Sequence, residues 1–112
     1  MKPAIFSILF AFIISAPGAE PVRYNRDVRP ILSDNCFHCH GPDQKARQAE
    51  LRLDIRDEAV KTADSGATPI VPSKPDDSEV VRRIVSTDAD ELMPPPDSRK
   101  SLSPRQKEIL NR

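Results

Sequence analysis

The chain has 112 residues, of which 38% are hydrophobic and 4% aromatic, and its 17 basic side chains balance 17 acidic ones. This even balance excludes the basic surface that a nucleic-acid-binding domain needs. The length allows one small domain, and the scarcity of aromatic residues leaves that domain a thin hydrophobic core.

Residues 1–19 have the features of a secretory signal peptide. Lys2 provides a short positive region, an apolar run extends to Ile14, and small residues lead up to Ala19. The apolar run is near eleven residues, well short of the roughly 20 that a membrane-spanning helix needs. We therefore expect export to the periplasm or cell envelope, no lipid anchor, and a mature domain over residues 20–112.

The first helix is predicted directly before the most informative motif. Residues 20–26 read as an extended entry. Asp27 is then a suitable N-cap for a short helix over residues 28–35, with Ile31 and Leu32 on one face. This helix leads straight into Cys36.

Residues 36–40 contain both cysteines and both histidines of the chain. Cys36 and Cys39 are followed at once by His40, which is the attachment pattern of c-type haem. Two thiols at this spacing can add across the two vinyl groups of one porphyrin. The imidazole of His40 is then placed to ligate the iron as the proximal ligand. His38 lies between the attachment points, and we expect it to be partly exposed.

Three other interpretations of the motif remain open. A thioredoxin-like redox pair needs a βαβ setting, and the polar residues 33–35 do not resemble a buried strand. A structural zinc site needs four ligands, whereas the rest of the chain has no further Cys or His. A small disulfide loop between Cys36 and Cys39 is the third alternative.

The middle of the chain is predicted to be mostly irregular. Residues 41–43 form a turn, residues 45–50 are charged and exposed, and residues 51–55 alternate as an extended segment with one buried face. One or two helical turns follow at residues 57–62. Arg47 and Arg52 could pair with haem propionates, although simple exposure to solvent explains them as well.

The clearest amphipathic helix follows residue 75. Asp76 is its predicted N-cap, and Glu79 stands three residues later as in a capping box. Its apolar stripe consists of Val80, Val81, Ile84 and Val85. Arg82 and Arg83 are predicted to form a solvated face, and the helix should end near residues 86–87.

Met93 begins a Met-Pro-Pro-Pro run at residues 93–96, in which three prolines favour an extended backbone. A thioether on such a loop suits the sixth coordination position of an electron-transfer haem, because Met opposite His raises the reduction potential. The alternative is that Met93 only fills a gap in the core.

The last helix is predicted to start at Ser103, with Pro104 in its first position and Gln106 completing a capping box. Only about two turns follow, which makes an isolated helix marginal. We therefore expect that this helix is cut short and that the natural chain continues.

With these elements in order, the chain resembles the planctomycete-type cytochrome c domain, a monohaem relative of the cytochromes c. The matching stretches are residues 25–32, 36–43, 51–54, 70–72, 78–84, 93–96 and 102–104. The resemblance implies an all-α fold wrapped around one covalently attached haem c. It also implies Cys36 and Cys39 as attachment points, His40 as proximal ligand and Met93 as the candidate distal ligand.

The expected function is one-electron transfer between redox partners that the sequence does not identify. The chain shows no paired carboxylates, no nucleophile with a base and no phosphate loop, so no small-molecule substrate is expected. One alternative is a haem sensor or peroxidase-like site with an open sixth position. The other is a haem-free interaction domain in which the cysteine pair is a disulfide.

Overall fold

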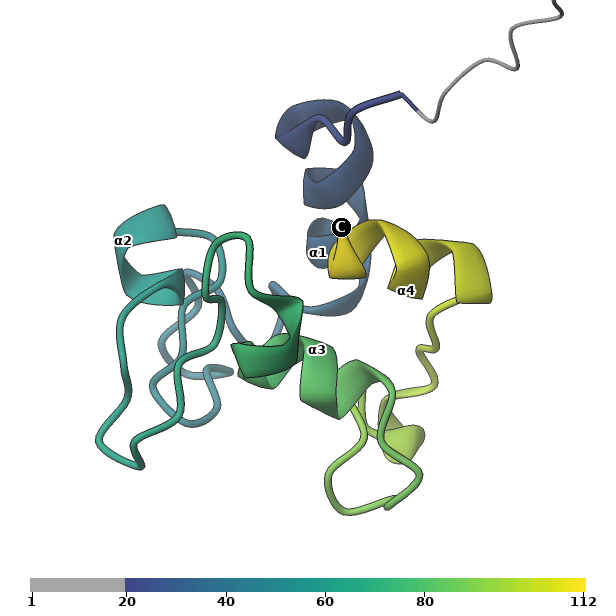
Figure 1. Cartoon of the computed structure of the whole chain (residues 1–112). Coiled ribbons are helices and arrows are strands. Elements are labelled where there is room, and N and C mark those ends of the chain that lie inside the picture. Colours follow the sequence, from purple (N-terminus) through teal and green to yellow (C-terminus); the bar gives the residue numbers. More distant parts are fainter. Residues whose placement is uncertain (1–19) are drawn as a thin grey trace, which may run out of the picture.

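The computed structural model describes residues 20–112, and the regular structure within this range is entirely helical. Its α-helices are α1 (Arg29–Asn35), α2 (Arg56–Ala59), α3 (Glu79–Ile84) and α4 (Pro104–Asn111) (Figure 1). The all-α prediction is confirmed for this range, whereas the predicted signal peptide lies outside it. Across residues 20–112, no helix has the length and apolar character required to cross a membrane.

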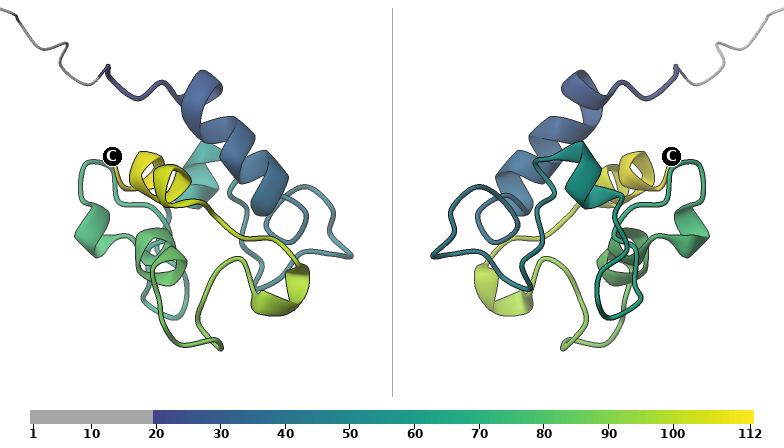
Figure 2. Two further views of the ribbon diagram at one scale, coloured as in Figure 1. Left: turned by 90° about the vertical axis from the view of Figure 1, so that its right-hand side faces the viewer. Right: turned by 90° about the vertical axis from the view of Figure 1, so that its left-hand side faces the viewer.

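The core lies where the first, third and fourth helices meet. Ile31 of α1, Ile84 of α3 and Leu102 before α4 form one buried cluster, against which Ile109 and Leu110 also pack. Figure 2 shows α4 lying beside the first helical segment, with long loops on the other side of the domain. Helices α1, α3 and α4 thus surround the core, whereas α2 lies apart from α4, among the loops (Figure 1).

The chain becomes helical earlier than predicted. A single π-helical segment, η1 (Tyr24–Val28), precedes α1, so the extended entry predicted through residue 26 is wrong. Asp27 is not the N-cap. Its carboxylate instead accepts a hydrogen bond from the Arg23 backbone N–H at 2.9 Å, while its own N–H donates to Arg23 O. Pro30 explains the wide turn, because its ring crowds the carbonyl four residues earlier.

The start of α3 also differs from the prediction. Asp76 lies in a 3-10 turn, η2 (Pro75–Asp77), and Ser78 occupies the N-cap position. The Ser78 hydroxyl is engaged elsewhere, since it accepts from Val71 N at 2.8 Å and donates to Lys74 O. The first N–H groups of α3 are satisfied by the preceding loop: Glu79 N donates to Thr68 O and Val80 N to Pro69 O, both at 3.0 Å. Distant backbone carbonyls therefore replace the predicted side-chain cap.

Two predicted apolar contacts are absent from the described part of the chain. Helix α3 ends at Ile84, two residues before the predicted end, so Val85 leaves the apolar stripe and is 57% exposed. In the segment predicted to be extended, Leu53 is buried, but Ile55 precedes α2 and is 39% exposed. The periodicity identified the correct regions but extended each apolar face by one residue too many.

Of the two predictions for the C-terminal part of the chain, the capping box is confirmed and the extended proline run is wrong. Both hydrogen bonds of the capping box at α4 are present, from Gln106 N to the Ser103 hydroxyl at 3.1 Å and from Ser103 N to Gln106 Oε1 at 2.9 Å. The proline run, however, does not stay extended, because Pro96 opens a 3-10 turn, η3 (Pro96–Ser98). Proline is tolerated in the first turn of a helix, where its missing N–H has no helical partner.

Candidate cofactor site

Cys36 ends α1, and the next four residues close a tight turn. The Cys36 N–H donates to Leu32 O at 2.8 Å, and both Cys39 N and His40 N donate back to Cys36 O, at 3.2 Å and 2.8 Å. This turn places both cysteines on one short piece of backbone, and both are free thiols. The disulfide interpretation of the motif is therefore not realised in this structure.

Gly41 closes the turn by a backbone approach that only glycine allows. A Cβ atom at this position would lie 2.1 Å from the carbonyl oxygen of Phe37 and 3.0 Å from its carbonyl carbon. Because these are backbone atoms of the same turn, they cannot move aside as a flexible side chain could. The residue after His40 therefore has to be glycine for the turn to close as it does.

Replacing Gly41 with alanine should lower the free energy of unfolding by about 2–4 kcal/mol, because the turn must open to relieve the contact. The matched control is Gly66→Ala, which meets no atom within 4 Å and is strained only by a φ of +88°. That strain should cost about 1–2 kcal/mol. Urea unfolding of the haem-loaded protein measures both variants. A smaller loss for Gly41→Ala than for Gly66→Ala would contradict this account.

The loop after the turn folds back and orients His40. Gln48 N donates to Cys39 O at 2.7 Å, and Leu53 N donates to His40 O at 2.8 Å. The Nδ1 atom of His40 lies 3.2 Å from Gln48 O. A carbonyl can only accept, so Nδ1 carries the proton of the neutral ring, and Nε2 keeps its lone pair for a metal.

The ionisation of the motif bears on two of its interpretations, metal ligation by His40 and a thioredoxin-like pair. Burial lowers the pKa of His40, a trend that the nearby Arg83 charge reinforces and the Gln48 hydrogen bond opposes. The lowered pKa favours the neutral imidazole, the form in which histidine binds a metal. Burial, together with the neighbouring Cys39, raises the pKa of Cys36 to about 11. Redox-active Cys-x-x-Cys pairs work by lowering a thiol pKa, so this thiol does not fit a thioredoxin-like site.

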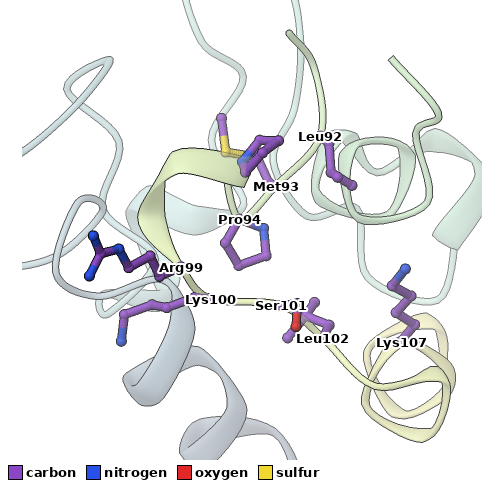
Figure 3. A pocket seen from close by; sticks show the side chains of 9 residues that line it. Leu92, Met93, Pro94, Arg99, Lys100, Ser101, Leu102 and Lys107 are labelled. Atoms are coloured by element: carbon purple, nitrogen blue, oxygen red, sulfur yellow. The ribbon is translucent and has the colours of Figure 1, made fainter. Parts of the chain in front are cut away.

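The backbone of Met93 is attached to α3. Its backbone N–H donates to Arg83 O at 3.2 Å, and Arg83 is the residue whose charge contributes to lowering the pKa of His40. Met93 also lines a cavity of about 370 Å³, together with Arg99, Lys100 and Lys107. Figure 3 shows its thioether pointing away from Lys100 and Leu102. Ligation of iron by His40 and Met93 stays a prediction.

The two arginines considered for haem propionates are held by the chain itself. Arg47 Nε donates to Gly41 O at 3.0 Å, next to the turn, and Arg52 forms an ion pair with Asp54 at 2.6 Å. Both side chains are therefore engaged by the protein, whereas the simpler interpretation left them free in solvent. His38, by contrast, is exposed, in line with the expectation.

A larger cavity, of about 630 Å³, has Leu32, Leu53, Val80 and Leu110 among the residues that line it. None of the three motif residues Cys36, Cys39 and His40 lines it. The cavity nevertheless borders the attachment turn, because Leu32 O accepts from Cys36 N and Leu53 N donates to His40 O, both at 2.8 Å. Among residues 20–112, no group of three or more His, Cys, Asp or Glu side chains could hold a metal ion, which leaves a structural zinc site without ligands.

The residues present fit a covalently attached haem. The turn offers two free thiols at the required spacing and an imidazole whose Nδ1 is occupied and whose Nε2 is available. The core is also thin, as expected for a domain that packs on a cofactor. Within residues 20–112 the buried hydrophobic residues are Ile31, Leu32, Leu53, Ala59, Ile84 and Leu102.

A small helical domain with Cys-x-x-Cys-His directly after its first helix is a c-type cytochrome domain. Comparison with protein families agrees, because the planctomycete cytochrome C family matches residues 36–97, more than half of the chain. The chain therefore belongs to the planctomycete cytochrome C family, and membership implies a covalently bound haem c. No curated protein and no solved structure matches it.

Sequence reasoning missed Gln48 and Arg83 as parts of this site. Gln48 acts through its backbone carbonyl, which every residue has, so no side-chain signal marks it. Arg83 had been placed on a solvated helix face. Its guanidinium instead donates to Glu79 at 2.8 Å, and its side chain is 35% exposed.

Proposed function

We propose that this chain is an exported one-electron transfer module that carries one haem c. Cys36 and Cys39 form the two thioether bonds, His40 supplies the proximal imidazole, and Met93 supplies the distal thioether. The bound haem supplies reversible one-electron chemistry at its iron. The redox partners are proteins or domains of the cell envelope, and the domain wraps around the haem.

The observation that carries the proposal is the orientation of His40. Its Nδ1 is held by Gln48 O, two free thiols lie within the preceding four residues, and Gly41 closes the turn. A hydrogen bond to the remote nitrogen of a ligating histidine fixes the ring and raises its basicity. The chain thus prepares its proximal ligand before any metal binds.

The remaining features favour electron transfer over the binding of small ligands or substrates at the iron. The thioether of Met93 would complete the coordination of the iron, so that small ligands would compete poorly, and its soft sulfur would favour the reduced state. The buried neutral imidazole binds the metal without first losing a proton. The domain needs no substrate pocket for this role.

The test is an absorption spectrum and an intact mass of residues 20–112, secreted from a host with the haem c maturation machinery. We expect a mass increase of one haem, sharp c-type bands on reduction and a weak sulfur-to-iron charge-transfer band on oxidation. Haem without the sulfur band, and with carbon monoxide binding after reduction, would support the sensor or peroxidase alternative. A haem-free protein two protons lighter than the reduced chain would support the disulfide alternative.

A further inference from the structure

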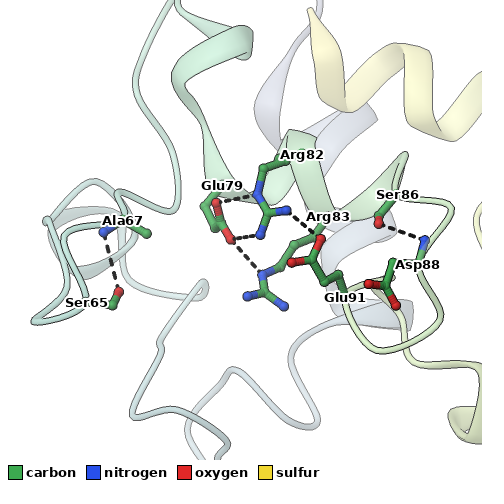
Figure 4. A network of polar contacts seen from close by, with 8 residues as sticks. All are labelled: Ser65, Ala67, Glu79, Arg82, Arg83, Ser86, Asp88 and Glu91. Carbon is green, nitrogen blue, oxygen red and sulfur yellow. Dashed lines mark hydrogen bonds and ion pairs between the residues drawn. The ribbon is translucent and has the colours of Figure 1, made fainter.

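The loop that delivers Met93 is tied to α3 at two points. It leaves the helix after Ile84 and returns at Met93, whose N–H donates to Arg83 O at 3.2 Å. The second tie is a side-chain ion pair between Arg82 Nη1 and Glu91 Oε2, at 2.7 Å (Figure 4). Helix α3 is fixed in the core by Ile84, which is 2% exposed, so both ties attach the loop to the rigid part of the domain.

Arg82 is held in place before it reaches Glu91. Its Nε and Nη2 atoms donate to the two carboxylate oxygens of Glu79, at 2.9 Å and 2.6 Å, and the same carboxylate accepts from Arg83 Nε at 2.8 Å. A guanidinium fixed by two parallel hydrogen bonds loses little further freedom when it binds a second carboxylate. The pKa of Glu79 falls to about 2 for the same reason, mainly through its hydrogen bonds to Arg82.

The remaining hydrogen bonds of the loop are local. Leu92 N donates to Asp88 O at 2.9 Å, and Asp88 N donates to the Ser86 hydroxyl at 3.1 Å. These contacts shape the turn but do not connect it to α3. Ser86 N also donates to Arg83 O, at 3.3 Å, but only where the loop begins. Where the loop returns, its connection to α3 depends on the Arg83–Met93 backbone hydrogen bond and on the Arg82–Glu91 pair.

We propose that Arg82 and Glu91 are positioning residues for the sixth coordination position, and that their ion pair holds the Met93 segment against α3. This inference rests on the proposed function, in which Met93 ligates the iron. A neutral thioether is a weak ligand, so its occupancy depends on its effective concentration at the metal. Restricting the loop raises that concentration without adding a contact to the ligand itself.

The test is a titration of the oxidised, haem-loaded protein with imidazole, which competes with the thioether for the iron. Loss of the sulfur-to-iron band reports the displacement. Glu91→Gln keeps the shape of the side chain and removes its charge. It should bind imidazole about fivefold more tightly than the parent, since the loop that carries the competing thioether is no longer held by the ion pair. Arg82→Gln should have the same effect, and the double variant should add little to either.

The matched control is Arg26→Gln. Arg26 also pairs with a neighbouring carboxylate, Asp27, and its side chain is 48% exposed against 47% for Arg82. It lies on η1, away from the Met93 loop, and its replacement should leave imidazole binding within about twofold of the parent. Added salt should raise imidazole affinity in the parent and change it less in Glu91→Gln, because salt screens the pair that the variant lacks.

Two results would overturn the proposal: imidazole affinity of Glu91→Gln within about twofold of the parent, or an equal change in Arg26→Gln. Met93→Ala separates this failure from that of the proposed function. If Met93→Ala keeps the sulfur band, Met93 is not the ligand and both proposals fail. If it loses the band while Glu91→Gln behaves like the parent, only the positioning role is wrong.

Discussion

Replacing Met93 with alanine is expected to abolish the sulfur-to-iron band of the oxidised protein and to lower the reduction potential by on the order of 100 mV. The thioether is a soft ligand that favours the reduced iron, and alanine offers no donor atom. The reduced variant should also bind carbon monoxide, which the parent should bind poorly. Potentiometric titration followed by absorption measures the first effect, and a carbon monoxide difference spectrum measures the second.

Leu92→Ala is the matched control for this substitution. Leu92 is the preceding residue, is partly exposed like Met93, and lines the same cavity. Truncating it removes apolar contact without removing a sulfur atom, so the band and the potential should persist. If Met93→Ala instead keeps the spectrum and potential of the parent, Met93 is only a core residue.

Replacing both Cys36 and Cys39 with serine is expected to yield a protein that gains no haem mass and unfolds without a cooperative transition. Burial of apolar surface contributes about 25 cal/mol per Å², and the described residues bury few hydrophobic side chains of their own. A chain of about 93 residues with so small a core is marginal without its cofactor. Intact mass and thermal denaturation followed by circular dichroism check both parts of the prediction.

His38→Ser is the control for disturbance of the motif. His38 is exposed and lies between the two cysteines, so its loss should leave both the attached haem and cooperative unfolding intact. A double cysteine variant that melts cooperatively at the temperature of the parent would show that the domain folds without haem. That result would favour the haem-free interaction domain.

Local chemistry made part of this structure predictable. The capping box at Ser103 and Gln106 depends on residues three apart, and both of its hydrogen bonds are present. The helix before Cys36 followed from periodicity and turn residues in the same way, whereas the all-helical character was implied by the family resemblance. In each case the interacting groups are neighbours in the chain, so their spacing alone defines the geometry.

Predictions failed where a distant partner competed for the same group. Asp76 and Glu79 fit a capping box, yet the carbonyls of Thr68 and Pro69 satisfy the helix start and Ser78 binds the loop before it. Glu79 instead pairs with Arg82 and Arg83. Arg82 stays exposed, as the pattern predicted, whereas Arg83 is only partly exposed. The helix brings these three side chains together, so they form ion pairs as well as contacts with solvent.

The amino-acid sequence determined the chemistry of the cofactor site, because the spacing of Cys36, Cys39 and His40 is a covalent property of the chain. It could not determine which imidazole nitrogen stays free, nor what holds the Met93 loop. Those features depend on Gln48 O, Arg83 O and the Arg82–Glu91 pair. Two of these partners are backbone carbonyls, which are alike in every residue, so only the folded chain can select them.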